Sequence, residues 1–506
     1  MTSDSPSGEE LRTAAAHGIR WSAVSRPTIE VLQLGSTVVL ARLIVPAEFG
    51  RFAIAVIAQE VALLLVTGGL TIALVQRKTL DREHARTGMG MALLTGLAMC
   101  ALTVLAASLI VAPLFGARTA LLVRLMAPLC LIEGIATSSM VTLRRRMAFR
   151  RLSELEVLNT VVRVAVCIAL ALVGLGGKAL VFGILAGALA AALIACVSAP
   201  PPSPRLQRAA IRDLLGGAVR MWLATISWLG FYNVDYAIIG ARLGPRPTGY
   251  YYRSYTVAVE YQSKLGLLMN EVGFPVMARA NGGAELAQIY GKMIRLLTIV
   301  TYPILVWLAI AAPVLIPFLF GARWTPAVVP TQILVVGGAS MIVFNAVRTV
   351  FMATGRVGAL AGFGWTQFVV YGCVVFLVAP LGITAVAIAA AGVHGLFAIV
   401  AYALMLRGSD ERPLRRLWSD LAPAIVSCVG LVAVALPVSI ALTAAHLPAV
   451  LWLAALGVVA APPYLLTLRL CFPATWRAQC AAVERILPGN RRLNRVRRRL
   501  QAAAVH

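Results

Sequence analysis

Apolar stretches of about 20 residues recur along the whole chain, separated by short polar connections. A transmembrane helix needs about 20 mostly apolar residues to cross the hydrocarbon core. Backbone groups in lipid must hydrogen-bond within their own segment, so we expect helices rather than isolated strands. We expect about fourteen spans on this criterion. Their ranges are 23–44, 50–75, 88–113, 119–142, 154–174, 178–200, 217–243, 249–275, 293–319, 326–353, 357–380, 382–406, 418–443 and 447–470.

The composition supports a membrane protein. Of the 506 residues, 60% are hydrophobic and 13% are charged, and the mean hydropathy is +0.86. A soluble domain has about 25% charged residues. The eight cysteines show no metal-ligand spacing, so we interpret them as small buried apolar residues. We therefore predict an all-α polytopic membrane protein that holds no metal and no cofactor.

The formal net charge of +25 predicts membrane topology rather than nucleic-acid binding. Most basic residues lie in alternate connections, such as Arg144-Arg145-Arg146, whereas the opposite connections hold single ones such as Arg118. This bias predicts a multi-pass membrane protein with a cytoplasmic N-terminus and a cytoplasmic C-terminus. No apolar signal-peptide core precedes Trp21, so we expect the first span to act as its own insertion signal.

The first twelve expected spans divide into two similar halves. Ala41-Arg42-Leu43, followed by Pro46 and Gly50, recurs as Ala241-Arg242-Leu243, followed by Pro245 and Gly249. The segment Leu-Phe-Gly-Ala-Arg at 114–118 recurs unchanged at 319–323. Six spans separate the copies, so the repeats are parallel, with the substrate expected between the halves. We expect a cytoplasmic N-terminal segment, a six-helix lobe, a proline-rich linker, a second six-helix lobe, an extra helix pair and a basic cytoplasmic tail. Their ranges are 1–22, 23–200, 201–216, 217–406, 407–470 and 471–506.

Charged residues inside spans are the most informative candidates, because each costs about 2.5–3.5 kcal/mol to insert. At 100° per residue, charged and polar residues form a stripe on each of the eighth, first and fifth spans. Asp235 follows an aromatic run in the seventh span. The stripe on the eighth span comprises Arg253, Glu260, Lys264 and Glu271. The stripe on the first span comprises Arg26, Glu30, Gln33 and Thr37, and that on the fifth span comprises Glu156, Asn159, Thr160 and Arg163.

Two interpretations of these stripes remain open. Arg26 with Glu30, and Glu260 with Lys264, are neighbours four residues apart that would neutralise each other. A hydrated central cleft accounts for all the stripes together. In that interpretation, basic side chains bind an anionic substrate and buried carboxylates couple transport to protons or cations. The candidate substrate-binding residues are Arg26, Arg220, Arg253, Lys264 and Arg348, and the candidate coupling residues are Asp235, Glu60, Glu260 and Glu30.

Catalytic motifs are absent from the sequence. Gly174-Leu175-Gly176-Gly177-Lys178 lacks the spacing of a phosphate-binding loop, and the five histidines are scattered. We therefore predict that the chain is not an enzyme. The basic segment from Arg477 to His506 has two interpretations, a topology determinant or an amphipathic helix on the anionic inner leaflet.

An ordered series of short motifs resembles the Wzx-type polysaccharide flippases, particularly their colanic-acid exporter branch. The resemblance covers roughly residues 20 to 410, with the extra helix pair and the basic tail outside the pattern. The matching residues are Ala41-Arg42-Leu43, Pro46, Phe49-Gly50, Leu74-Val75-Gln76-Arg77-Lys78, Arg146-Met147-Ala148-Phe149-Arg150, Asp235, Ile239-Gly240, Gly249-Tyr250-Tyr251, Phe274-Pro275, Gly321 to Trp324, Pro326 and Thr354-Gly355-Arg356.

The resemblance implies the fold of the multidrug/oligosaccharidyl-lipid/polysaccharide exporter superfamily, with two six-helix lobes around a central cleft. It also implies movement of an undecaprenyl-pyrophosphate-linked oligosaccharide from the cytoplasmic to the periplasmic leaflet by alternating access, driven by an ion gradient. The resemblance implies a location in the bacterial inner (plasma) membrane and a pathway of exopolysaccharide or lipopolysaccharide biosynthesis. Candidate partners are the lipid-linked oligosaccharide, membrane lipids, a coupling proton or sodium ion, and polysaccharide polymerase and chain-length proteins. The alternatives are a lipid II flippase and a multidrug/cation antiporter of the same fold.

Overall fold

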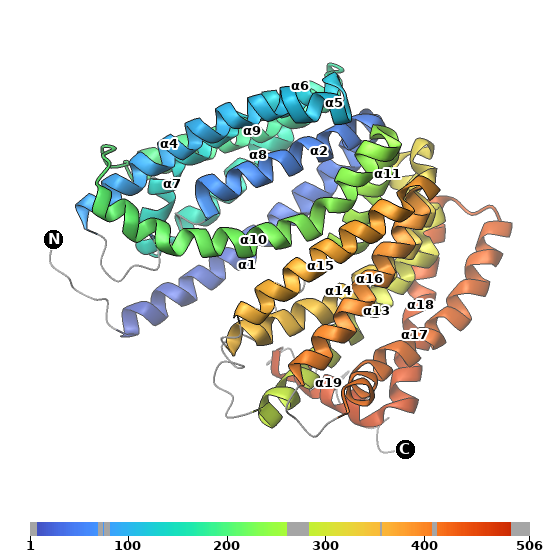
Figure 1. Cartoon of the computed structure of the whole chain (residues 1–506). Helices are drawn as coiled ribbons and strands as arrows, with labels where there is room; N and C mark the ends of the chain where they lie inside the picture. The colour runs from blue at the N-terminus through green and yellow to red at the C-terminus, as the bar shows by residue number, and fades with distance from the viewer. Residues whose placement is uncertain are drawn as a thin grey trace. The chain divides into compact units, whose positions relative to one another are not determined.

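The computed structural model describes residues 8–68, 74, 81–260, 283–354, 357–406 and 412–486 (Figure 1). Within these residues the chain forms helices and no β-strand, which confirms the all-α prediction. Eleven of the described helices are long and apolar enough to cross a membrane, and each overlaps one expected span. The remaining three expected spans fall on α1, on α10, and on α11 together with residues outside the described ones.

The helices follow one another through short connections, and the segments labelled η are short π-helical or 3₁₀ stretches, several of which continue an α-helix. The first part of the chain contains α1 (Gly8–Leu43), α2 (Pro46–Leu63), η1 (Leu64–Gly68), α4 (Arg82–Ala106), η2 (Ala107–Val111), α5 (Ala112–Phe115), α6 (Ala117–Met126), α7 (Leu129–Arg145), α8 (Phe149–Leu172) and α9 (Gly177–Ser198). The second part contains α10 (Arg208–Leu243), α11 (Pro245–Tyr255), η3 (Thr256–Glu260), α13 (Gly283–Phe320), η4 (Ala322–Ala327), α14 (Val328–Ala353), α15 (Val357–Val378), η5 (Ala379–Leu381), α16 (Ile383–Met405), α17 (Pro413–Ala444), α18 (Ala449–Cys471) and α19 (Pro473–Ile486).

The chain forms two compact units. The first comprises Met1–Val257, Ile316–Leu334 and Val357–Val393, and the second comprises Ala258–Leu315, Val335–Arg356 and His394–His506. Each unit gathers segments that are far apart in the sequence.

The two copies of the glycine motif meet each other in the first unit. A Cβ atom on Gly50 of α2 would lie 1.8 Å from the carbonyl oxygen of Pro245, and one on Gly249 of α11 would lie 1.9 Å from that of Pro46. The contact is reciprocal, so α2 and α11 cross at equivalent positions of the repeat. Only glycine allows two backbones to approach this closely.

The repeated Leu-Phe-Gly-Ala-Arg segments also share a backbone conformation. Gly116 has φ +84° and Gly321 has φ +97°, a region that favours glycine. The second copy packs against the end of α1, where the Arg42 side chain donates to the Leu319 carbonyl at 2.9 Å. The Trp324 indole donates to the Ala41 carbonyl at 2.9 Å. The repeat is therefore present in the backbone as well as in the sequence.

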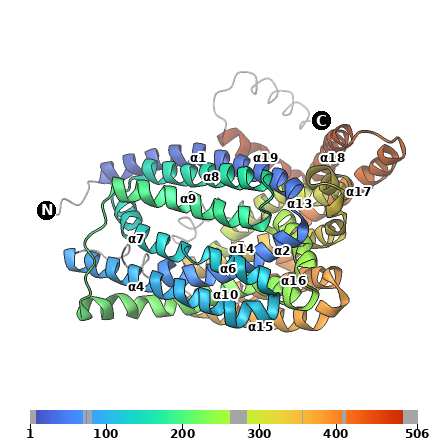
Figure 2. The ribbon, with the colours of Figure 1, turned by 90° about the horizontal axis from the view of Figure 1, so that it is seen from above.

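Small residues bring α8 and α9 together in the first unit. A Cβ atom on Gly183 would lie 2.8 Å from the Arg163 carbonyl oxygen, and one on Gly187 would lie 2.6 Å from the Asn159 carbonyl oxygen. The helix α8 also packs against α1, and Figure 2 shows α1, α8 and α9 side by side. This packing fixes the α8 face that carries Asn159 and Arg163.

The second unit packs the helix pair α17 and α18 against α13. Its core includes Ala424 and Leu431 of α17, Leu456 and Trp452 of α18, and Ile299 of α13. The Tyr464 hydroxyl donates to the Ile299 carbonyl at 2.8 Å and satisfies a polar group inside this apolar core. The helix pair is thus integrated into the second unit.

Candidate functional site

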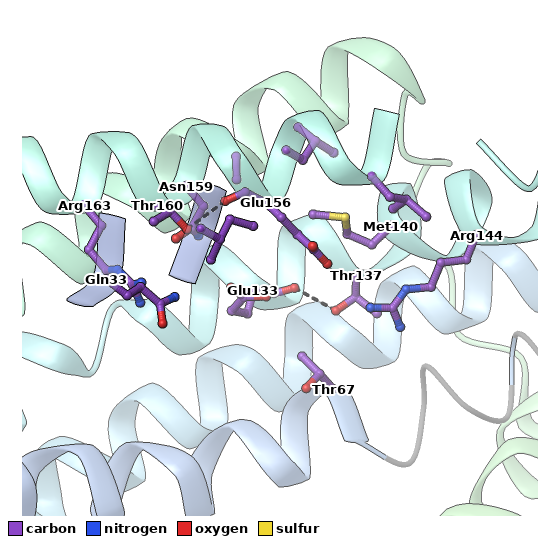
Figure 3. A pocket seen from close by; sticks show the side chains of 14 residues that line it. Gln33, Thr67, Glu133, Thr137, Met140, Arg144, Glu156, Asn159, Thr160 and Arg163 are labelled. Carbon is purple, nitrogen blue, oxygen red and sulfur yellow. Dashed lines mark hydrogen bonds between the residues drawn. The ribbon is translucent and has the colours of Figure 1, made fainter. Parts of the chain in front are cut away.

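A polar cavity of about 580 Å³ lies among α1, η1, α7, α8 and α9 of the first unit (Figure 3). This volume is in the usual range for ligand pockets. Its lining residues are Ile29, Gln33, Thr67, Glu133, Thr137, Met140, Arg144, Leu152, Leu155, Glu156, Asn159, Thr160, Arg163 and Ala191. A cavity with this many polar side chains inside membrane-spanning helices provides a hydrated environment for a polar ligand.

Helical spacing explains how α7 and α8 supply most of the polar lining. Glu133, Thr137 and Arg144 follow one another at intervals that keep them on one face of α7. The hydroxyl of Thr137 donates to the Glu133 carbonyl at 2.7 Å, and that of Thr160 donates to the Glu156 carbonyl at 2.9 Å. Both threonine hydroxyls therefore donate their hydrogen bonds to backbone carbonyls of their own helices. The charged side chains are left to determine what the cavity binds.

The cavity balances two basic side chains against two acidic ones. Figure 3 shows Arg144 and Arg163 at opposite ends, with Glu133 and Glu156 between them. No ion pair within 4.0 Å joins these four described residues to one another. Guanidinium groups bind phosphate oxygens through two parallel hydrogen bonds, whereas carboxylate groups accept hydrogen bonds from hydroxyls. The arrangement therefore suits a ligand that carries both phosphate and hydroxyl groups.

A second polar cluster surrounds Asp235 of α10, which is fully buried in the first unit. Its carboxylate accepts hydrogen bonds from the Tyr371 hydroxyl at 2.8 Å and from the Tyr251 hydroxyl at 3.0 Å. The backbone N–H of Tyr236 donates to the other carboxylate oxygen at 2.9 Å. The rings of Phe231 and Tyr371 lie 5.4 Å apart beside it. The aromatic run that precedes Asp235 in the sequence thus contributes to its enclosure.

Aromatic rings enclose Arg253 of α11, which is 5% exposed. Its guanidinium carbon lies 4.5 Å from the centre of the Phe49 ring, 5.4 Å from that of Phe320 and 5.7 Å from that of Trp324. Aromatic faces stabilise a desolvated cation by about 2 kcal/mol. Packing therefore explains how this charge is buried, and the substrate contact expected of Arg253 stays a prediction.

Among the residues whose side chains are described, none of the other expected site residues lines the polar cavity. Arg26 is exposed and Glu30 is half-buried on α1. Glu60 of α2 is exposed and accepts a hydrogen bond from the Asn233 side chain at 3.2 Å. In the second unit, Glu260 and Arg348 are half-buried. The side chain of Arg220 and the whole of Lys264 lie outside the described residues.

Sequence comparison places the chain in a family. The family model described as "Polysaccharide biosynthesis protein" matches residues 39–329, more than half of the chain. The chain belongs to this family. The matched residues include α7, α8, Asp235 and Arg253, whereas α17 and α18 lie outside them.

Three curated relatives of this chain come from bacteria. The "Uncharacterized membrane protein in cps region" of Klebsiella pneumoniae is 22% identical over 71% of this chain and 76% of its own length. The teichuronic acid biosynthesis protein TuaB of Bacillus subtilis is 22% identical over 72% of this chain and 76% of its own length. The lipopolysaccharide biosynthesis protein WzxC of Escherichia coli is 23% identical over 69% of this chain and 71% of its own length. These matches confirm the resemblance inferred from the motifs.

Solved structures confirm the expected fold. The lipid II flippase MurJ, in an inward closed conformation, matches with a TM-score of 0.74 over 90% of this chain and 99% of that one, at 12% identity. An inward-facing multidrug resistance MATE family transporter of the MOP superfamily matches with a TM-score of 0.61, at 14% identity. This match covers 74% of this chain and 93% of the transporter. At these identities the likeness establishes a shared fold alone.

Proposed function

We propose that this protein flips an undecaprenyl-pyrophosphate-linked oligosaccharide from the cytoplasmic to the periplasmic leaflet of a bacterial inner membrane. The polar cavity carries this proposal, because it combines phosphate-binding and hydroxyl-binding side chains inside apolar helices. Sugars and phosphate lose hydrogen bonds in lipid at a cost of several kcal/mol per group, so they need a hydrated path. The prenyl chain needs none and stays in the bilayer.

Movement proceeds by alternating access of two six-helix lobes. The protein holds the substrate while it changes from one open state to the other. The lobes are residues 23–200 and 217–406, joined by the linker 201–216, and both termini are cytoplasmic. The sequence repeat and the reciprocal crossing at Gly50 and Gly249 support a parallel two-fold relation between these halves. Arg26, Arg220, Arg253, Lys264 and Arg348 provide additional positive charge along the path.

Surface polysaccharide is a better-supported product than peptidoglycan. The curated relatives are named for teichuronic acid biosynthesis, lipopolysaccharide biosynthesis and a cps region. The likeness to the lipid II flippase is one of fold, at 12% identity. The substrate in this proposal is therefore a precursor of exopolysaccharide or lipopolysaccharide. Polysaccharide polymerase and chain-length proteins act on it after it reaches the periplasmic leaflet.

An ion gradient drives the cycle through carboxylates of the spans, of which the buried Asp235 is the first candidate and Glu30, Glu60 and Glu260 are the others. The two tyrosine hydroxyls on Asp235 provide polar partners, and its fully buried position puts any bound proton or sodium ion beyond bulk water. A cation bound there neutralises the carboxylate. Neutralisation changes the free energy of keeping the Asp235 side chain buried in its surroundings.

Replacing Asp235 by asparagine is expected to abolish gradient dependence while preserving the fold, because the amide keeps an oxygen acceptor and a similar shape. In proteoliposomes with an imposed proton or sodium gradient, translocation by Asp235→Asn should be no faster than without the gradient. Tyr251→Phe is the control, because it retains the carboxylate and the Tyr371 hydrogen bond. Gradient acceleration of the asparagine variant equal to that of the wild type would show that coupling lies elsewhere.

The proposal is tested in a deletion strain. Surface polysaccharide should be lost, and the lipid-linked precursor should accumulate with its glycan accessible from the cytoplasmic side. Wild-type protein should restore both to normal. Unchanged surface polysaccharide and unchanged precursor in the deletion strain, with no second flippase present, would overturn the proposal.

A further inference from the structure

The side chain of Gln367 on α15 is fully buried in the first unit, yet its amide has no hydrogen-bond partner in the part of the chain that the structure describes. This holds for the amide oxygen and for the amide nitrogen. Buried polar groups are nearly always hydrogen-bonded, and a buried water molecule is a common partner where the protein supplies none. An amide donates and accepts hydrogen bonds, as water does. Gln367 is therefore suited to hold a buried water molecule.

Gln367 faces α10, which packs beside α15 (Figure 1). One turn before it, a Cβ atom on Gly364 would lie 2.8 Å from the hydroxyl oxygen of Ser227 on α10. One turn after it, the centre of the Tyr371 ring lies 5.4 Å from that of the Phe231 ring on α10. Residues three and four apart share one face of a helix, so Gln367 lies between these two contacts with α10. The buried amide is thus one helical turn from Tyr371.

The carboxylate of Asp235, which Tyr371 contacts, keeps one position open. Within the described residues it accepts three hydrogen bonds and forms no ion pair. The hydroxyls of Tyr251 and Tyr371 donate to one oxygen, and the backbone N–H of Tyr236 donates to the other. A carboxylate has about four lone-pair sites, so the second oxygen retains one. A proton occupies that site without moving any of these groups.

The same geometry disfavours a metal cation at Asp235. Both tyrosine hydroxyls present hydrogen atoms to the carboxylate, whereas a cation needs oxygen lone pairs turned toward it. Hard cations bound by protein oxygens take about six ligands or more. The backbone carbonyls of the surrounding helices are already used in their own hydrogen bonds. A sodium ion would therefore require the site to rearrange, and a proton does not.

Other titratable groups lie near Asp235 without pairing with its charge. Tyr255 lies beside Tyr251 on α11, with the two ring centres 6.1 Å apart, and tyrosine hydroxyls are neutral near neutral pH. Glu60 of α2 accepts a hydrogen bond from Asn233 of α10. The other elements packed against α10, which include α4 and α5, give the Asp235 carboxylate no hydrogen bond or ion pair within the described segments. Asp235 is therefore the group whose charge a bound proton cancels.

We propose that the coupling ion at Asp235 is a proton and that water held by Gln367 carries it there. This inference rests on the proposed function, in which Asp235 is the coupling residue. The carboxylate oxygen with the open lone pair gains an O–H bond and becomes neutral, the water gives up that proton, and bulk water replaces it. Gln367 lies nearer than Tyr371 to Leu360, where the candidate span begins, so the path leads toward that membrane surface. Gln367 is thus a positioning residue for the coupling proton.

Infrared difference spectroscopy of the full-length protein in lipid vesicles tests the ion without requiring transport. A neutral carboxyl group has a C=O stretching band that a carboxylate lacks, and the band of Asp235 is the one that disappears in Asp235→Asn. It should grow as the pH is lowered and keep its intensity when sodium replaces potassium. A band that does not change with pH, or that sodium removes, would overturn the proposal. The expected band together with unchanged surface polysaccharide in the deletion strain would reject the flippase and leave the proton site standing.

The role of Gln367 is tested by the time that deuterium takes to reach Asp235. Gln367→Met keeps a side chain of similar length without the amide, and should slow the deuterium shift of the Asp235 band about tenfold, because the path loses its hydrogen-bonding group. Loosened packing would speed the shift, so the sign separates the two effects. Thr366→Val is the matched control, since Thr366 is exposed on the same helix and donates to the Gly362 carbonyl. A shift in Gln367→Met as fast as in the control would exclude Gln367 from the proton path.

Discussion

Alanine at Gly50 is expected to destabilise the protein by about 3 kcal/mol, because the added Cβ has no space at the α2–α11 crossing. The nearest atom to that Cβ is the Pro245 carbonyl oxygen at 1.8 Å, and backbone cannot rotate away as a flexible side chain does. The two helices must separate along their contact. Gly249→Ala should have a similar effect, since its Cβ would lie 1.9 Å from the Pro46 carbonyl oxygen.

The measurement is unfolding of purified protein in detergent, by heat or by titration with a denaturing detergent. Gly35→Ala on α1 is the matched control, because no atom lies within 4 Å of its added Cβ. That control should be unchanged or more stable by about 0.5–1 kcal/mol, since alanine favours helix over glycine. The double variant at Gly50 and Gly249 should lose less than the sum of the two single losses, because one helix separation relieves both clashes. Wild-type stability of either single variant would contradict the crossing.

Loss of both arginines from the polar cavity is expected to reduce surface polysaccharide about tenfold or more, because hydrogen bonds to charged groups contribute about 1.5–3 kcal/mol each. The variant Arg144→Gln/Arg163→Gln keeps side chains of similar length at both ends of the cavity. The fold should tolerate it, since neither arginine forms an ion pair with Glu133 or Glu156.

This prediction is measured by complementing the deletion strain with each variant at equal protein level. Polysaccharide at the cell surface and precursor in the membrane are quantified together. Arg118→Gln/Lys178→Gln serves as the control for removing positive charge elsewhere in the first unit. Full surface polysaccharide with Arg144→Gln/Arg163→Gln would exclude the cavity from the transport path.

The sequence was sufficient for the class of fold, because hydropathy reports directly on membrane insertion. Each of the eleven described candidate spans overlaps an expected one. The repeat was also visible in the sequence, through Gly50 with Gly249 and through the two copies of Leu-Phe-Gly-Ala-Arg. The sequence did not reveal that the repeated glycines contact each other, because helical periodicity describes one helix at a time.

Part of the polar cavity followed from the charged stripes. The fifth-span stripe placed Asn159, Thr160 and Arg163 on one face, and these residues line the cavity together with Gln33 of the first span. Sequence reasoning missed Glu133, although a lone acid in an apolar span is a signal in itself. The stripes expected on the first and eighth spans, including Arg26 and Lys264, remain predictions.

Arg144 and Tyr371 were missed for different physical reasons. Arg144 belongs to a run of three arginines that was interpreted as a topology signal, although it lies on the same helical face as Glu133 and Thr137. Tyr371 makes its hydrogen bond with Asp235, 136 residues away in the chain. Tertiary packing brings such a pair together, and no local sequence pattern predicts it.

Translocation in proteoliposomes tests the central claim most directly. Purified protein is reconstituted with a fluorescent undecaprenyl-pyrophosphate-linked oligosaccharide in the inner leaflet, and a membrane-impermeant lectin or glycosidase detects glycan that reaches the outer leaflet. Wild-type protein should expose the glycan at a rate that rises with protein density, and Arg144→Gln/Arg163→Gln should be at least about tenfold slower. Exposure no faster than in protein-free vesicles, with and without an imposed ion gradient, would contradict a flippase.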